Sequence, residues 1–269
     1  MGRRIGVICG AGGFPRLALE EIRKQAGECV AAGIEGQADP GLCRGLFPFA
    51  WFKAGEVERL VSFFKMHDVT QAIMAGKIDP IVIYRHEGWE ENSRKILEMA
   101  DSRSPSVVLG LVIQHLAGRG IEIINPAFLL EPYFCREGTL TRNRPSREAD
   151  QDIAFGLKAA RAIADLDIGQ TVVVKNKAVV AVEGMEGTDE TVRRGGKLAG
   201  SGAIVAKVGR TSQDMRIDVP AVGLDTLKAL AECGAEALAV EADKVAFFQR
   251  DEALNLAEAR GIAVVARKV

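Results

Sequence analysis

The chain has 269 residues, of which 48% are hydrophobic and 26% charged, as expected for a globular protein with a sizeable core. A formal net charge of −1 and an aromatic content of 6% argue against a nucleic-acid-binding surface. No segment approaches the ~20 apolar residues of a membrane span, and no signal peptide is recognisable. The five cysteines include no C-x-x-C pair, and the three histidines show no metal-ligand spacing. We therefore expect a cytoplasmic protein that meets a membrane only from its surface.

The N-terminal residues predict the start of a nucleotide-binding sheet. A buried strand over 4–9 is followed by the small-residue turn Gly10–Pro15, a helix over 16–26 and a second strand over 29–34. Pro15 suits the first helical position. Such a β-turn-α-β unit opens doubly wound α/β sheets. We therefore predict a Rossmann-like domain over residues 1–130.

Two features of this domain are candidates for phosphate contact. Backbone N–H groups at Gly12 and Gly13 could approach a phosphate at the helix N-terminus, although Pro15 replaces the third glycine of the dinucleotide fingerprint. Lys77 follows a predicted strand and would lie at the sheet edge where ligands bind. A tight turn without a ligand, and a solvated lysine, are the alternatives. The remaining strands are expected over 46–52, 71–75 and 121–124, and the remaining helices over 57–66, 90–100 and 107–117.

The C-terminal half reads as a mixed α/β domain over 148–269, after a linker or crossing segment over 131–147 that is rich in arginine and contains two prolines. Its clearest feature is a hairpin of two β-branched strands, 171–175 and 178–182, around a turn with Asn176. The other elements expected here are helices over 150–163, 189–198, 226–233 and 251–259, and strands over 203–208, 238–240, 245–249 and 262–266.

The stretch from Gln213 to Thr226 is the strongest candidate for a functional segment. It carries Asp214, Asp218, Asp225 and Arg216, and its Pro220 and Gly223 exclude a regular helix. Carboxylates on an irregular segment suit a divalent cation or a phosphoryl-transfer site. An ordinary surface loop has the same composition and is the alternative.

The start of the helix over 189–198 is a second candidate. Thr188 is predicted as its N-cap, and the carboxylate of Asp189 would complement the helix dipole. Alternatively, the helix N-terminus and the carboxylate would together face a phosphate and its metal ion.

Several motifs in combination resemble one family. They are Glu183-Gly-Met-Glu-Gly-Thr-Asp-Glu, Gln213-Asp-Met-Arg-x-Asp-x-Pro-x-x-Gly-x-x-Thr, Asp167-Ile-Gly-Gln and the early Cys-Gly-Ala-Gly-Gly-Phe-Pro turn. Together they resemble the UDP-2,3-diacylglucosamine pyrophosphatases of lipid A biosynthesis, of the type unrelated to the metallophosphoesterase enzymes. The resemblance spans nearly the whole chain.

The resemblance implies a two-domain hydrolase with its substrate between the domains. The reaction would be the hydrolysis of UDP-2,3-diacylglucosamine to UMP and 2,3-diacylglucosamine 1-phosphate, dependent on Mg²⁺ or Mn²⁺. The metal-binding and catalytic residues would be Asp225, Asp214 and Asp189. The substrate-binding residues would be Gly12, Gly13, Lys77, Gln170, Thr188, Gln213 and Arg216.

The implied setting is a Gram-negative bacterium, with transient contact between the enzyme and the cytoplasmic surface of the inner membrane. We expect a homodimer, because closed two-fold assemblies are the commonest soluble oligomers. Two other functional classes stay open on the residues alone. They are an NAD-type oxidoreductase built on the Gly12 turn, and a nucleotide or lipid carrier without catalytic activity.

Overall fold

The computed structural model describes residues 4–25, 27–85 and 89–269, and the chain divides into two compact units. Unit 1 comprises Met1–Leu129 together with Asp214–Asp218. Unit 2 comprises Leu130–Gln213 together with Val219–Val269. Ala26, at the predicted end of the first helix, and His86 lie outside the described residues.

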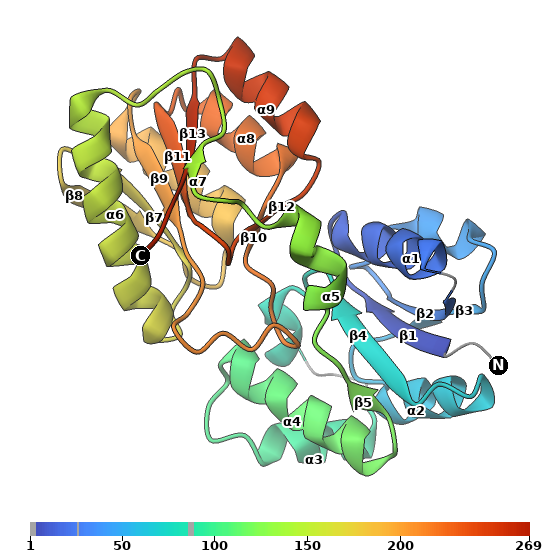
Figure 1. Cartoon of the computed structure of the whole chain (residues 1–269). Helices are drawn as coiled ribbons and strands as arrows, with labels where there is room; N and C mark the ends of the chain where they lie inside the picture. Colours follow the sequence, from blue (N-terminus) through green and yellow to red (C-terminus); the bar gives the residue numbers. More distant parts are fainter. Residues whose placement is uncertain (1–3, 26, 86–88) are drawn as a thin grey trace. The chain divides into compact units, whose positions relative to one another are not determined.

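Unit 1 is built on a five-stranded, wholly parallel sheet with the order β3-β2-β1-β4-β5 (Figure 1). This order confirms the predicted Rossmann-like fold. It also reverses between β1 and β4, and the crevice at such a reversal is where open α/β sheets bind ligands. The strands are β1 (Arg4–Cys9), β2 (Glu28–Ile34), β3 (Phe49–Phe52), β4 (Gln71–Ala75) and β5 (Glu122–Ile123).

Helices cover both faces of this sheet: α1 packs on one face, and α2 and α4 pack on the other (Figure 1). Ile8, Phe64 and Leu116 belong to the core between the sheet and helices α2 and α4. The helical segments of residues 1–130 are α1 (Phe14–Lys24), η1 (Pro40–Arg44), α2 (Val57–Met66), η2 (Pro80–Ile83), α3 (Glu91–Glu98), α4 (Pro105–Gly118) and α5 (Ala127–Leu130).

The third strand is shorter than predicted. It begins at Phe49 rather than Leu46, because Pro48 has no N–H group to donate to the ladder. The connection that leads to it contains only the short η1 segment, which the sequence reading missed. Asp39 caps η1 by accepting a hydrogen bond from the Gly41 N–H at 2.8 Å.

Unit 2 contains a six-stranded mixed sheet with the order β6-β13-β11-β9-β7-β8, and a separate parallel pair of β10 and β12. Strands β9, β11 and β13 run parallel, whereas β7 is antiparallel to β9 and β8. The strands are β6 (Gly138–Thr139), β7 (Thr171–Lys175), β8 (Ala178–Val182), β9 (Ile204–Lys207), β10 (Ala221–Val222), β11 (Ala237–Glu241), β12 (Ala246–Phe247) and β13 (Ala263–Arg267). Strand β6 lies within the predicted linker and pairs with β13. That segment therefore contributes an edge strand to unit 2.

The alternation of side chains along the strands separates two cores in unit 2. Val172 and Ile204 pack towards α6, whereas Val173 and Val205 pack in the core that also contains residues of α7, α8 and α9. The helical segments are η3 (Glu131–Tyr133), α6 (Arg147–Asp165), α7 (Thr188–Ala199), α8 (Leu224–Glu232) and α9 (Arg250–Ala259). In the part of the chain that the structure describes, no helix is long and apolar enough to cross a membrane.

The predicted hairpin of β7 and β8 is confirmed, and its turn is fixed by a buried carboxylate. Asn176 and Lys177 both have positive φ, at 51° and 58°, as a two-residue type I′ turn requires. Asp152 on α6 is 7% exposed and accepts hydrogen bonds from the backbone N–H groups of both turn residues at 2.7 Å. One acidic side chain thus joins α6 to the hairpin.

We predict that Asp152→Ala lowers the free energy of unfolding by about 2–4 kcal/mol, because two backbone N–H groups of the turn lose a buried, charged acceptor. Asp150→Ala is the matched control on the same helix. The side chain of Asp150 is 57% exposed, and its ion pair with Arg267 is long, at 3.6 Å. This substitution should cost less than about 1 kcal/mol. Urea unfolding followed by circular dichroism measures both, and equal losses would contradict the role given to Asp152.

Candidate functional site

Polar side chains of unit 2 gather at one edge of its sheet. The parallel strands β9 and β11 end there with Lys207 and Glu241, the latter paired in register with Arg267 of β13. Thr171, at the start of the antiparallel β7, pairs with Lys207 in the ladder. The Thr171 carbonyl accepts a hydrogen bond from the N–H of Glu183, the residue after β8. This edge is the position at which open α/β sheets bind ligands.

A buried network around Lys207 occupies this edge. The Lys207 Nζ atom donates to the Thr188 hydroxyl at 2.7 Å and to the Thr171 hydroxyl at 3.3 Å, and lies 3.8 Å from the Glu183 carboxylate. Thr188 in turn donates to Glu183 Oε1 at 2.8 Å, and the Gln170 N–H donates to Glu183 Oε2 at 3.1 Å. All five residues are less than 9% exposed. The buried charges are therefore paired and hydrogen-bonded, as burial of ionised groups requires.

Glu183 is held in its ionised form by this network. Burial alone would raise the pKa of the Glu183 carboxyl, but the Lys207 ammonium group and hydrogen bonds from Thr171, Thr188 and Gln170 bring its pKa below the ordinary value. At neutral pH the sheet edge thus carries a fixed negative charge next to a fixed positive one. The sequence analysis did not single out Lys207, and it quoted Glu183 as the start of a family motif without giving it a role.

Helix α7 begins one residue earlier than predicted, so Thr188 is not its N-cap. The N-cap is Gly187, whose φ of 82° is a left-handed conformation that favours glycine, and Thr188 is the first helical residue. The Thr188 hydroxyl is occupied by Glu183 and Lys207 instead of capping the helix. Thr188 therefore attaches the N-terminus of α7 to the buried ion pair.

The N-termini of α7 and α8 meet through one hydrogen bond. Thr226, in the first turn of α8, donates its hydroxyl proton to Asp189 Oδ1 at 2.9 Å. Asp225 precedes Thr226, and its side chain is 73% exposed and accepts a hydrogen bond from Lys228 Nζ at 2.8 Å. The structure thus places Asp189 and Asp225 in the first turns of two adjacent helices.

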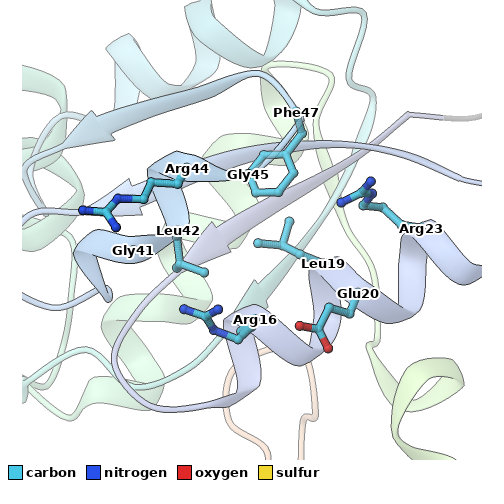
Figure 2. Close-up of a pocket in the computed structure, with 9 residues that line it drawn as sticks. All are labelled: Arg16, Leu19, Glu20, Arg23, Gly41, Leu42, Arg44, Gly45 and Phe47. Carbon is cyan, nitrogen blue, oxygen red and sulfur yellow. The ribbon is translucent and has the colours of Figure 1, made fainter.

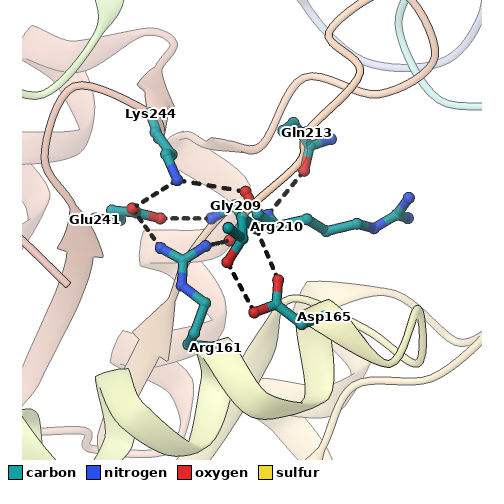
Figure 3. Close-up of polar contacts among 8 residues, drawn as sticks. Arg161, Asp165, Gly209, Arg210, Gln213, Glu241 and Lys244 are labelled. Carbon is teal, nitrogen blue, oxygen red and sulfur yellow. Dashed lines mark hydrogen bonds and ion pairs between the residues drawn. The ribbon is translucent and has the colours of Figure 1, made fainter.

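The loop after β9 is fixed by a second network, centred on Glu241 (Figure 3). Glu241 is 4% exposed and accepts hydrogen bonds from Arg161, which also bonds the Gly209 carbonyl, and from the Gly209 N–H at 3.0 Å. Lys244 Nζ lies 3.1 Å from the same carboxylate. Gln213, predicted to bind substrate, accepts a hydrogen bond through Oε1 from the Arg210 N–H at 2.9 Å. The sequence analysis gave Glu241 no role, although this acidic residue directly follows the strand predicted over 238–240.

Asp214 and Arg216 form a close pair within unit 1. The guanidinium group of Arg216 contacts both carboxylate oxygens of Asp214, at 2.7 Å for the shortest contact. Hydrogen bonds from Arg216 lower the pKa of Asp214 below its ordinary range. Ile217 packs against the core of unit 1 and anchors this turn. The negative charge of Asp214 is thus balanced by its neighbour.

The Gly10–Gly13 loop of unit 1 is joined to the loop after β4. Ala11 and Lys77 form an isolated antiparallel bridge. The Ala11 N–H donates to the Lys77 carbonyl with an N···O distance of 2.7 Å, and the Lys77 N–H donates to the Ala11 carbonyl at 3.0 Å. A Cβ atom on Gly10 would lie 2.3 Å from the Lys77 carbonyl oxygen, so only glycine permits this approach. In contrast, among the described residues no atom other than those of the adjoining residues lies within 4 Å of the Cβ positions at Gly12 and Gly13. The Gly12 turn and Lys77 are therefore brought together, beside open space.

The predicted site residues thus divide between the units. Unit 1 contains Gly12, Gly13, Lys77, Asp214 and Arg216, and unit 2 contains Gln170, Thr188, Asp189, Gln213 and Asp225. Within each unit, the described residues contain no group of three or more His, Cys, Asp or Glu residues placed to bind a metal ion. In unit 2, the first turns of α7 and α8 carry the carboxylates of Asp189, Glu190 and Asp225, and one or two carboxylates are what Mg²⁺ usually takes from a protein.

We predict that Lys207→Met lowers the free energy of unfolding by about 3–5 kcal/mol at neutral pH, because it leaves a buried carboxylate unpaired. The stabilisation that the lowered pKa of Glu183 gives the wild type is present above the ordinary carboxyl pKa of about 4.3 and is lost as the pH falls through the folded-state value. In the variant, burial raises the pKa of Glu183 instead. The difference in the free energy of unfolding between the wild type and Lys207→Met should therefore become smaller as the pH falls.

Denaturant unfolding at a series of pH values tests this expectation. Lys95→Met is the control, because it breaks the exposed pair with Glu91 at 2.6 Å and should cost less than about 1 kcal/mol. If Lys207→Met lowers the free energy of unfolding by the same amount at every pH, the loss does not come from the ion pair with Glu183.

Comparison with known families covers both halves of the chain. Residues 4–133 match the family described as the LpxI N-terminal domain, and residues 136–265 match the LpxI C-terminal domain. A relative from Caulobacter vibrioides, named UDP-2,3-diacylglucosamine pyrophosphatase LpxI, is 26% identical over 275 residues, which span 98% of this chain and 97% of the relative. The resemblance predicted from the motifs is confirmed, and the chain belongs to the LpxI family.

Proposed function

We propose that this chain hydrolyses the diphosphate bond of UDP-2,3-diacylglucosamine, releasing UMP and 2,3-diacylglucosamine 1-phosphate for lipid A biosynthesis. Membership of the LpxI family and the name of the Caulobacter relative support this activity. The structural observation that carries the proposal is the meeting of two helix N-termini. Thr188 ties α7 to buried Lys207, and the next residue, Asp189, accepts a hydrogen bond from Thr226 of α8.

This arrangement suits a diphosphate group. The N-terminus of an α-helix carries partial positive charge and directs N–H groups towards an anion. Two such termini adjoin here, and the Lys207 ammonium group lies behind the first of them. Because Glu183 neutralises its charge within a buried ion pair, Lys207 acts here by holding Thr188 in place. We propose that Thr188 and the first turn of α7 hold the phosphate oxygens of the substrate.

The two carboxylates at these helix starts have a different proposed role. Asp225 and Asp189 would hold a divalent cation, Mg²⁺ or Mn²⁺, since both offer hard oxygen donors and the Asp225 side chain is 73% exposed. A bound cation of this kind supplies charge neutralisation for the diphosphate and makes a bound water more acidic. Asp225 would also orient the water that attacks phosphorus or accept a proton from it. The P–O bond between the two phosphates breaks, and the leaving oxygen departs with UMP or the sugar phosphate.

The other predicted residues have proposed roles at the same substrate. Arg216 would neutralise phosphate charge, with Asp214 as its partner or as a further cation ligand, and Gln213 and Gln170 would orient the phosphates. In unit 1, the open space at Gly12 and Gly13 leaves room for the uridine diphosphate, with the exposed Lys77 next to it. We also propose that the enzyme works as a homodimer and meets the inner membrane peripherally, because its substrate carries two acyl chains.

We predict that Asp225→Ala reduces the Mg²⁺-dependent release of UMP from UDP-2,3-diacylglucosamine by at least about 10²–10³-fold while the protein stays folded. Its exposed side chain makes no buried contact whose loss would unfold the domain. Asp251→Ala is the control, because Asp251 is an exposed aspartate in the first turn of another helix, α9. Hydrolysis by Asp225→Ala at the wild-type rate would refute the assignment. UDP-lipid binding without UMP release by the wild-type protein would instead indicate a carrier.

We predict that Gly13→Ala weakens the binding of UDP by about tenfold or more, since the new methyl group enters the open space at the loop. The substitution should leave the fold intact, because nothing lies within 4 Å of the Cβ position and the φ of −80° is ordinary for alanine. Gly110→Ala provides the control: its Cβ position, within α4, is equally free of neighbours. Isothermal titration calorimetry with UDP gives the affinities. Unchanged affinity in Gly13→Ala would remove this loop from the proposed site.

A further inference from the structure

A groove in unit 1 lies apart from all the residues assigned above. It has a volume of about 400 Å³ and runs between α1 and the segment that joins β2 to β3. Figure 2 shows Leu19, Leu42 and Phe47 at its centre and three arginine side chains around them. The groove exists because the β2–β3 connection contains only the five-residue η1 segment where a doubly wound sheet usually has a covering helix.

The rim of the groove is dominated by positive charge. Arg16, Arg23 and Arg44 are exposed, and the acid that lines the groove with them is Glu20. Asp39 contacts Arg16 at 2.8 Å and also attracts Arg44, so the three arginines face two carboxylates, Glu20 and Asp39, and the rim keeps a positive balance. Arginine is well suited to phosphate because its planar fork donates two parallel hydrogen bonds.

A strongly exposed apolar residue lies next to this rim. Leu46, between the lining residues Gly45 and Phe47, is 87% exposed, more than any other large apolar side chain among the described residues. An exposed leucine beside arginines is the pattern of a surface that enters the boundary between lipid headgroups and acyl chains. A soluble phosphate ligand would account for the arginines and leave Leu46 unexplained.

We propose that Arg23, Arg44 and Leu46 form a docking surface for an anionic lipid membrane. The arginines bind headgroup phosphates, and Leu46 inserts at the acyl-chain boundary. This inference builds on the proposed function, because a substrate with two acyl chains has to be collected from a membrane. A few basic residues and one apolar side chain give weak, reversible binding that depends on salt, which suits an enzyme that must also leave the membrane.

The test measures binding of the full-length protein to vesicles by flotation, with phosphatidylcholine alone and with phosphatidylcholine mixed with phosphatidylglycerol. The wild type should bind the mixed vesicles more strongly, and less so at high salt. The double variant R23E/R44E should lose about tenfold or more of its partition into mixed vesicles, because each basic residue near an anionic surface contributes severalfold. Leu46→Asp should lose binding to a similar degree without altering either arginine.

Two control variants share the chemistry but lie elsewhere in unit 1. Arg94→Glu reverses an exposed charge on α3, and Met66→Asp replaces a side chain that is 76% exposed at the end of α2. Both should bind like the wild type. If R23E/R44E and Leu46→Asp also bind like the wild type, or if the wild type does not distinguish the two vesicle types, the proposal is overturned. Displacement of the vesicles by millimolar inorganic phosphate at constant ionic strength would equally overturn it, in favour of a soluble anion.

A separate measurement keeps this proposal apart from the enzymatic one. R23E/R44E should hydrolyse detergent-dispersed UDP-2,3-diacylglucosamine at the wild-type rate and be slow only with substrate embedded in mixed vesicles. If the wild type hydrolyses neither form of the substrate, the proposed function fails, whereas the flotation result still decides the docking surface by itself.

Discussion

The buried ion pair of Lys207 and Glu183 is the constraint on which the C-terminal half depends. Burial of two charges is tolerated only with mutual pairing and full hydrogen bonding. Thr188 satisfies both partners at once, at 2.7 Å from Lys207 and 2.8 Å from Glu183. This requirement ties the end of β9, the residue after β8 and the start of α7 to one point. The position of the α7 N-terminus at the sheet edge follows from it.

The two units contribute different physical features to the proposed chemistry. Unit 2 offers charge, from two adjoining helix N-termini and from the carboxylates of Asp189 and Asp225 that would hold a cation. Unit 1 offers space, because in the part of the chain that the structure describes only adjoining residues lie within 4 Å of the Cβ positions at Gly12 and Gly13. The backbone bridge between Ala11 and Lys77 keeps that loop in place. A bulky anionic substrate needs both features, open room for its nucleoside and fixed charge for its phosphates.

The segment around Asp214 shows how similar residues acquire different roles. Asp214 is neutralised by Arg216 in a turn anchored by Ile217, whereas Asp225 opens a helix with its carboxylate in solvent. The network of Glu241 and Arg161 fixes the loop that leads into this segment. Both carboxylates have a basic partner, but the side chain of Asp225 is 73% exposed and that of Asp214 only 36%. The greater exposure of its carboxylate is the reason for proposing Asp225 rather than Asp214 as the catalytic aspartate.

The sequence by itself determined most of the longer local elements, the fold class and, through its motifs, the family. Runs of β-branched residues predicted β7, β8 and their turn, and periodicity predicted α2 and β4 with the bounds observed. The tertiary structure decided the strand order, the pairing of Lys207 with Glu183, the contact of Thr226 with Asp189 and the start of α7 at Thr188, with Gly187 as its N-cap. These depend on contacts between residues distant in the chain, which local periodicity does not record. Thr188 illustrates the difference: its neighbours favoured a helix cap, but its buried partners occupy its hydroxyl.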